Sequence, residues 1–156
     1  MDKTIAIDYQ EYDSVNELSC EDYALMQRAI GATEGAYAPY SGFCVGAALR
    51  LKDGAVIVGS NQENVAYPSG LCAERTAIFA ASAQYPQCRD YEALAIVGRN
   101  AEGCLCEASP CGACRQVLSE YEHVQNHPLR VICYLEGGRV RVFLSVKNLL
   151  PFSFDF

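Results

Sequence analysis

The chain has 156 residues, of which 51% are hydrophobic and 20% charged, so it is expected to fold as one domain with a substantial core. Its net charge of −7 argues against a nucleic-acid partner, because a protein that grips a polynucleotide normally needs a basic stripe. Its apolar runs are too short for a membrane span, and its acidic start lacks the plan of a signal peptide.

The first half of the chain contains clear signals for a helix followed by two strands. Residues 1–20 are an acidic N-terminal extension of uncertain order. Apolar residues at helical spacing predict a helix over residues 21–37. Strands are predicted over residues 43–51 and 55–60, because Asp53-Gly54 between them is a strong hairpin signal.

The second half predicts alternating helices and strands. An Ala-rich helix is expected over residues 71–84, and Ser109-Pro110 is typical of the cap and first residue of another helix, ending near residue 121. Strands are expected at 92–98, 130–135 and 139–144, a loop at 99–110, and a short helix with a tail at 145–156. This order predicts a mixed five-stranded sheet with helices on its faces.

Cysteines carry the strongest functional signal. The total of nine is odd and occurs in an apolar, enzyme-like sequence, which favours reduced thiols and a cytoplasmic location. Cys111 and Cys114 share one face of a predicted helix start, and Cys72 lies in the first turn of another helix. Helix N-termini favour thiolates, and three thiolates leave a fourth position for water, as in catalytic zinc sites. We therefore predict one Zn²⁺ per subunit.

Glu74 and Arg75 follow the first of these cysteines. Glu74 lies about 200° around an ideal helix from Cys72, which makes it a poor second chelator but leaves it within reach of a water at the metal. A carboxylate there can take a proton from water and deliver it to a substrate nitrogen, although a Glu early in a helix can also simply complement the helix dipole. Arg75 can donate to a ligating sulfur and offset the charge, or remain solvated.

The sequence contains two alternative sets of metal ligands, and we reject both. His123 and His127 follow Cys111 and Cys114, but only eight residues separate Cys114 from His123, short of the roughly 12 of a zinc finger. The alternative set of Cys104 and Cys106 with the later pair would form a closed four-thiolate site, yet it leaves Cys72 and its neighbouring Glu unexplained.

The pattern Cys72-Ala73-Glu74 with Pro110-Cys-Gly-Ala-Cys114 resembles the zinc nucleoside and nucleobase deaminases. Within this group, the chain resembles the small homotetrameric, zinc-dependent cytidine deaminases. The resemblance runs in collinear order from about residue 21 to residue 154. The further matching segments are Tyr40-Ser-Gly-Phe-Cys-Val-Gly-Ala-Ala48, Asn61-Gln-Glu-Asn-Val-Ala-Tyr-Pro68 and Leu149-Leu-Pro151.

This resemblance implies a three-layer α/β/α sandwich with a catalytic domain over residues 21–156. It implies hydrolytic deamination of cytidine and deoxycytidine to uridine and deoxyuridine plus ammonia, in pyrimidine salvage. It also implies a homotetramer with active sites at the subunit interfaces.

The resemblance further assigns roles to individual residues. Asn61 and Glu63 would bind ribose hydroxyls, and backbone groups of Ala73 would meet the pyrimidine edge. Phe43 would pack against the base, although it can equally be a core residue, and Tyr67 would lie near the subunit junction. An aromatic residue from a neighbouring subunit would close the pocket. By position this residue is Phe154, with Phe152 and Phe156 as rival rings.

Other functions stay open on the sequence alone. Within the same fold, the substrate can be a related aminopyrimidine or a nucleoside antibiotic such as blasticidin S, although the Asn61-Gln-Glu-Asn64 loop favours a nucleoside. A more remote alternative is a noncatalytic zinc-binding interaction module, for which Glu74 beside an open metal position would have no use.

Overall fold

The computed structural model describes residues 1–155, so the rival ring Phe156 lies outside the described residues. The helices are α1 (Cys20–Ala32), α2 (Ala73–Gln84) and α3 (Gly112–Gln125). The strands are β1 (Gln10–Tyr12), β2 (Cys44–Leu51), β3 (Val56–Ser60), β4 (Tyr91–Arg99), β5 (Leu105–Cys106), β6 (Arg130–Tyr134) and β7 (Val140–Phe143). Short 3₁₀ turns lie at Val15–Glu17, Thr33–Gly35, Tyr67–Ser69, Glu136–Gly138 and Val146–Asn148.

These strands form one mixed sheet. Its order is β1-β7-β6-β4-β2-β3, with β5 paired to β4 outside this path, so seven strands replace the five predicted. Only β4 and β6 run parallel, and the other pairings are antiparallel. The five predicted strands all form, and the two additional ones come from the N-terminal extension and from the segment that the sequence predicted as a loop.

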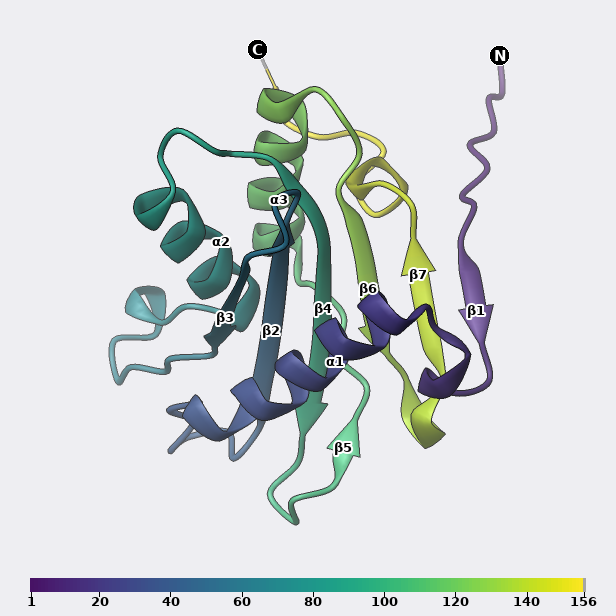
Figure 1. The fold of residues 1–156 in the computed structure, drawn as a ribbon. Helices are drawn as coiled ribbons and strands as arrows, with labels where there is room; N and C mark the ends of the chain where they lie inside the picture. Colours follow the sequence, from purple (N-terminus) through teal and green to yellow (C-terminus); the bar gives the residue numbers. More distant parts are fainter. Residues whose placement is uncertain (156) are drawn as a thin grey trace.

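Alternating residues of the central strands build two separate cores. Leu94 and Ile96 of β4 pack with α2 and α3, whereas Ala95 and Val97 of the same strand pack with α1. In Figure 1, α1 crosses one face of the sheet, and α2 and α3 cover the other. The predicted three-layer α/β/α sandwich is therefore confirmed.

Two glycines let the helices approach the sheet closely. A Cβ at Gly46 of β2 would lie 2.0 Å from the carbonyl oxygen of Ala29 in α1. A Cβ at Gly59 of β3 would lie 2.4 Å from the backbone nitrogen of Ala77 in α2. Because real Cβ atoms do not make such contacts, any side chain at Gly59 would push away the helix that follows Cys72.

The predicted boundaries of all three helices need correction, and the second helix starts at Ala73 rather than at residue 71. The first helix ends at Ala32 rather than near residue 37, and the chain continues as a 3₁₀ turn over Thr33–Gly35, in which Thr33 is buried. Its hydroxyl donates to the Ile30 carbonyl (2.7 Å) and accepts from Arg99 Nε (2.9 Å). The third helix starts at Gly112 with Cys111 as its N-cap, two residues later than the predicted start, and it continues to Gln125.

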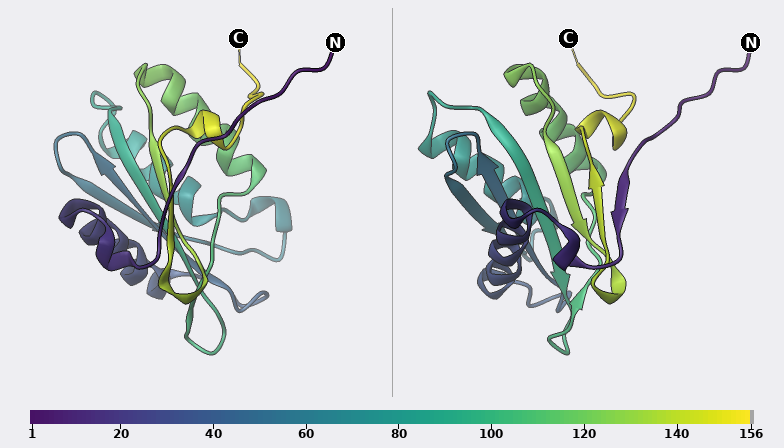
Figure 2. Two further views of the ribbon diagram at one scale, coloured as in Figure 1. Left: turned by 90° about the vertical axis from the view of Figure 1, so that its right-hand side faces the viewer. Right: turned by 45° about the vertical axis from the view of Figure 1, so that its right-hand side comes forward.

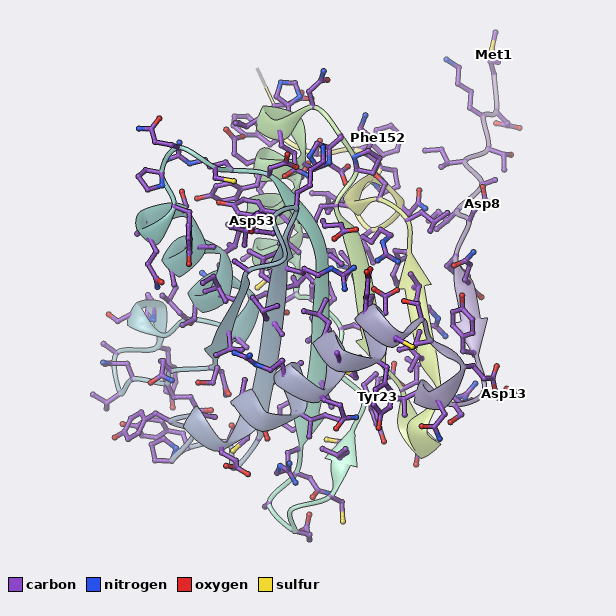
Figure 3. The ribbon with its side chains drawn as sticks, in the orientation of Figure 1. Met1, Asp8, Asp13, Tyr23, Asp53 and Phe152 are labelled. Atoms are coloured by element: carbon purple, nitrogen blue, oxygen red, sulfur yellow. The ribbon has the colours of Figure 1, made fainter. Side chains whose placement is uncertain are left out.

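The N-terminal extension is partly ordered against the sheet. Glu11 in β1 pairs with Arg141 in β7 and accepts hydrogen bonds from Arg139 (2.8 Å) and Arg141 (3.2 Å). Just before β1, the Asp8 carbonyl accepts a hydrogen bond from Asn148 Nδ2 (2.7 Å), and the Tyr9 ring lies 5.9 Å from the ring of Phe143. The first residues of the chain run away from the body of the molecule (Figure 2), and Figure 3 labels Met1 at their end. Within residues 1–155, no helix is long and apolar enough to cross a membrane.

Candidate metal centre and active site

Two helix starts bring the three predicted cysteines together. Cys72 is the N-cap of α2, Cys111 is the N-cap of α3, and Cys114 is the third residue of α3. The Sγ atoms of Cys72 and Cys111 are 3.8 Å apart, those of Cys111 and Cys114 are 3.5 Å apart, and all three lie within 4.8 Å of one another. Neither N-cap side chain makes a capping hydrogen bond, so both thiols are left for other partners.

This spacing fits a tetrahedral zinc ion. Sulfur ligands about 2.3 Å from such an ion lie about 3.8 Å apart, close to the separations seen here. Among the described residues, these three cysteines form the only group of three or more His, Cys, Asp or Glu side chains close enough to share an ion. Cys104, Cys106, His123 and His127 do not join such a group, so neither rejected metal site is assembled.

The electrostatics of the cluster favour ionised sulfur. Hydrogen bonding from the Cys114 thiol, with further hydrogen bonds from Arg75 and Cys111, lowers the pKa of Cys72 to about 5. The pKa of Cys114 is raised, because its proton is held in the hydrogen bond to Cys72 and because the thiol is buried. Binding a zinc ion would displace that proton, since the metal takes the thiolate form.

Arg75 lies beside the first ligand. Its Nη2 donates to the Cys72 sulfur at 3.5 Å, and its Nε is buried without a hydrogen-bond partner. The guanidinium therefore supplies positive charge to a site whose thiolates carry an excess of negative charge. Such a partner limits the loss of Lewis acidity that three anionic ligands would otherwise cause.

Glu74 is the second residue of α2 and is almost completely buried, with 4% of its surface exposed. Burial raises the pKa of its carboxyl to about 7, and the charge of Cys72 adds to this effect, while Arg75 opposes it. A carboxyl group with a pKa near 7 can both accept and donate a proton at neutral pH. The arrangement thus places a proton carrier directly beside a metal site.

A cleft opens in front of Cys72. Its cavity volume is about 530 Å³, and its walls include Cys72, Arg75, Asn61, Glu63 and Tyr67. The loop that precedes α2 thus shares one cavity with the metal centre, as expected of a site that binds a polar substrate.

Asn61 and Glu63 already shape this cleft through hydrogen bonds to the neighbouring loop. Asn61 accepts from the backbone nitrogen of Val45 (2.7 Å) and donates to the carbonyl of Phe43 (2.9 Å). Glu63 accepts from the backbone nitrogen of Tyr40 (2.9 Å) and from the Ser41 hydroxyl. The Ser41 hydroxyl and the Tyr40 N–H hold the pKa of Glu63 below its usual value, so this carboxylate stays anionic.

The other residues predicted to contact the substrate differ in their burial and in their position relative to the cleft. Ala73 is fully buried between the ligand Cys72 and Glu74. The Phe43 ring packs over Gly98 and is 36% exposed. Tyr67 is 80% exposed at the rim of the cleft, where its ring meets the edge of Tyr40 at a centroid distance of 6.4 Å.

Phe154 lies away from the cleft of its own chain. It lines a smaller cavity, of about 300 Å³, near the C-terminal end of α3, together with His123 and His127. Phe154 is 69% exposed and Phe152 is 85% exposed. Sequence reasoning did not foresee that Gln116 contacts this tail, and no spacing pattern signals such a contact.

Comparison with known proteins agrees with this geometry. Residues 19–127 match the family model described as the cytidine and deoxycytidylate deaminase zinc-binding region. A cytidine deaminase of Halalkalibacterium halodurans is 51% identical over 132 residues, which cover 83% of this chain and 91% of that protein.

Solved structures give the same result. A crystal structure of cytidine deaminase from Burkholderia pseudomallei matches with a TM-score of 0.73 at 43% identity, covering 85% of this chain and 98% of that chain. The enzyme from Mycobacterium tuberculosis matches with a TM-score of 0.66 at 37% identity, covering 85% and 96%.

The helix-flanked mixed sheet, the open three-cysteine zinc site and the buried glutamate together define a zinc-dependent hydrolytic deaminase. The chain belongs to the cytidine and deoxycytidylate deaminase family.

Proposed function

We propose that the chain converts cytidine and deoxycytidine to uridine and deoxyuridine, with release of ammonia. The observation that carries this proposal is the buried carboxyl of Glu74, with a pKa near 7, beside three cysteines spaced to hold zinc. Deamination needs water activation and two proton deliveries, and this pairing supplies both.

The residues of the site divide the chemistry between them. Cys72, Cys111 and Cys114 would hold the zinc ion, which supplies Lewis acidity that lowers the pKa of a water ligand. Glu74 accepts a proton from the attacking water and passes it to ring nitrogen N3 of the cytosine. That protonation makes the adjacent amino-bearing carbon more electrophilic, so water oxygen adds there. Glu74 then takes the second proton from the added hydroxyl group and delivers it to the amino group. The C–N bond breaks, ammonia leaves, and the carbonyl of the uracil ring forms.

Substrate binding follows from the walls of the cleft. Asn61 and Glu63 contact the ribose hydroxyls, and the fixed negative charge of Glu63 disfavours a phosphate in the same place. The backbone of Ala73 meets the pyrimidine edge, and Phe43 contacts the base. The roles of Asn61 and Glu63 rest on the family resemblance and on their place in the wall of the cleft, whereas those of Ala73 and Phe43 rest on the resemblance alone. The remaining polar capacity of Asn61 after its two backbone hydrogen bonds suits a hydroxyl partner.

The assembly is proposed to be a homotetramer with active sites at subunit interfaces. Tyr67 at the rim of the cleft lies near the junction, and Phe154 from a neighbouring subunit closes the pocket. High exposure of both aromatic side chains supports this arrangement, because exposed large rings often mark interaction sites. Residues 1–20 would be an extension of the catalytic domain at 21–156, and the enzyme would serve pyrimidine salvage in the cytoplasm.

The decisive experiment is an ammonia-release assay with cytidine, with and without a zinc chelator. Cytidine and deoxycytidine are expected to be deaminated, and chelation is expected to stop turnover. A preference for blasticidin S or free cytosine would indicate that the substrate is one of these related molecules. Turnover of an oligonucleotide would contradict the proposed nucleoside specificity. Bound zinc without any deamination would instead indicate an interaction module.

A further inference from the structure

The C-terminal tail is attached to α3 through paired hydrogen bonds. Gln116 Nε2 donates to the carbonyl oxygen of Phe154 (2.8 Å), and the backbone nitrogen of Phe154 donates to Gln116 Oε1 (3.0 Å). One amide side chain therefore satisfies both main-chain groups of a single residue, as a neighbouring strand would. Such a pair fixes the position of the tail on α3, and the register then depends on what holds the other end of the segment.

The adjacent residue holds the other end of the same segment. Arg115 Nη1 donates to the carbonyl of Leu149 (3.0 Å), and its Nε donates to the carbonyl of Pro110 (2.9 Å). Pro110 directly precedes the ligand Cys111, so this side chain ties the tail and the metal-binding turn to one guanidinium. The segment from Leu149 to Phe154 is thus bound at both ends by successive residues of α3.

These contacts fix the tail relative to the metal ligands. Gln116 follows Cys114 by two residues, which is a rise of about 3 Å along the helix axis. A shift of the tail by two residues would bring Phe152 to Gln116. Such a shift would also take the Leu149 carbonyl away from Arg115 and move the buried Leu149 side chain out of its packing. The tail register is therefore linked to the same helix that supplies two of the three sulfur ligands.

The two described aromatic residues of the tail differ in how they are held. Phe152 is 85% exposed and makes no hydrogen bond within residues 1–155, whereas the main chain of Phe154 is bound on both sides. Figure 3 labels Phe152 on this tail. An aromatic ring on a fixed main chain binds its target at a lower entropic cost than one on a free chain.

We propose that Gln116 is a positioning residue that sets the register of the tail, so that Phe154 rather than Phe152 closes the neighbouring subunit's cleft. This inference rests on the proposed function, because it assumes that a tail aromatic reaches that cleft. Gln116 itself contacts no substrate and acts only through the main chain of Phe154.

The test is a comparison of Gln116→Ala with Gln84→Ala, an exposed glutamine at the end of α2. Gln116→Ala is expected to raise the KM for cytidine about 10-fold, consistent with the loss of two hydrogen bonds. Its kcat and zinc content are expected to stay near wild type, because closure of the pocket contributes uniform binding rather than chemistry. Gln84→Ala is expected to leave KM unchanged.

Double variants identify the ring on which Gln116 acts. In a Phe154→Ala background, Gln116→Ala is expected to add less than about twofold to KM, because the residues act as one unit. In a Phe152→Ala background it is expected to keep its full effect. The proposal is overturned if Gln116→Ala behaves like Gln84→Ala, or if its effect disappears only in the Phe152→Ala background.

A readout without substrate separates this inference from the proposed function. Amide hydrogen exchange at Phe154 in the wild-type protein is expected to be slow, and exchange in Gln116→Ala is expected to be at least 10-fold faster. Equal exchange rates in both proteins would refute the positioning role of Gln116 even if the enzyme is fully active. A slow exchange in a protein that does not deaminate cytidine would instead refute the proposed function, and the positioning role would fall with it.

Discussion

Two buried carboxyl groups on opposite faces of the sheet behave in opposite ways. Both are buried, since Asp22 in α1 is 6% exposed and Glu74 in α2 is 4% exposed. Asp22 forms ion pairs with Arg50 (3.0 Å) and Arg130 (2.7 Å). Burial alone would raise the pKa of Asp22, but the hydrogen bonds and charges of the two arginines outweigh it and lower that pKa. The pKa of Glu74 is raised to about 7 by its burial.

The difference teaches how to distinguish a structural acid from a reactive one. Asp22 is fixed in its ionised form by two cations and links α1 to β2 and β6. Glu74 lies beside anionic sulfur with only partial compensation from Arg75, so its proton can be exchanged near neutral pH. Burial is nearly equal in the two cases, and the surrounding charges decide the role.

The largest effect is expected from removing the metal beside which Glu74 is proposed to act. Cys111→Ala deletes one of the three proposed ligands and is expected to lose zinc, activity and thermal stability together. Zinc content, ammonia release and the unfolding temperature would be measured against Cys104→Ala, an exposed cysteine outside the site. Full zinc occupancy in the Cys111 variant would require a different ligand set.

The next effect tests the proton carrier alone. Glu74→Gln preserves shape but cannot carry a proton, so turnover is expected to fall by about 10²–10⁴-fold while zinc remains bound. Cytidine absorbance and zinc content are the measurements, and Glu102→Gln on an exposed turn serves as the control. Turnover near the wild-type rate would remove Glu74 from the mechanism.

Breaking the buried ion cluster is expected to affect stability and not chemistry. Asp22→Asn leaves Arg50 and Arg130 without their shared carboxylate, which should cost about 3–5 kcal/mol of unfolding free energy. Denaturant unfolding measures this loss, and Asp13→Asn on the surface is the control. A large fall in kcat with unchanged stability would reverse the roles of the two carboxyl groups.

The same variant should change the response to acid. The hydrogen bonds and charges of Arg130 and Arg50 hold the pKa of Asp22 below its ordinary value, so the unfolded chain binds a proton more readily than the folded one. The stability from Asp22 is therefore present above about pH 4 and disappears as the pH falls through its lowered value. Between pH 5 and pH 3, the free energy of unfolding should therefore fall more steeply in the wild-type protein than in Asp22→Asn, as measured by denaturant unfolding.

The smallest effect is expected where an ion pair lies at the surface. Glu11→Gln weakens the contacts of β1 with Arg139 and Arg141, whose side chains are 48% and 31% exposed. Solvent screening limits the cost to about 0.2–1 kcal/mol, and added salt should reduce it further. Denaturant unfolding at low and high salt, with Glu17→Gln as control, measures it. A cost equal to that of Asp22→Asn would contradict this ranking.

Most of the fold could be predicted from local patterns, and the errors occurred where distant contacts intervene. Strand β1 forms because Gln10–Tyr12 pairs with β7, more than 120 residues along the chain, and its short acidic sequence contains no independent strand signal. Strand β5 follows a turn in which Gly103 N–H donates to the Asn100 carbonyl (3.0 Å) at a positive φ of 82°. The turn between Asn100 and Gly103 is readable in the sequence, whereas the two-residue strand that follows it forms only by pairing with β4.

What the sequence by itself determined was the chemistry of the site. The spacing of Cys111 and Cys114, and of Cys72 and Glu74, is local, and helix geometry then dictates which side chains lie near a helix start. The tertiary structure alone decided that two helix starts 39 residues apart would meet. It also decided that Glu74 would be desolvated and that Gln116 would hold Phe154. Covalent spacing sets neighbours within a turn, whereas burial and charge environment depend on what the rest of the chain packs against.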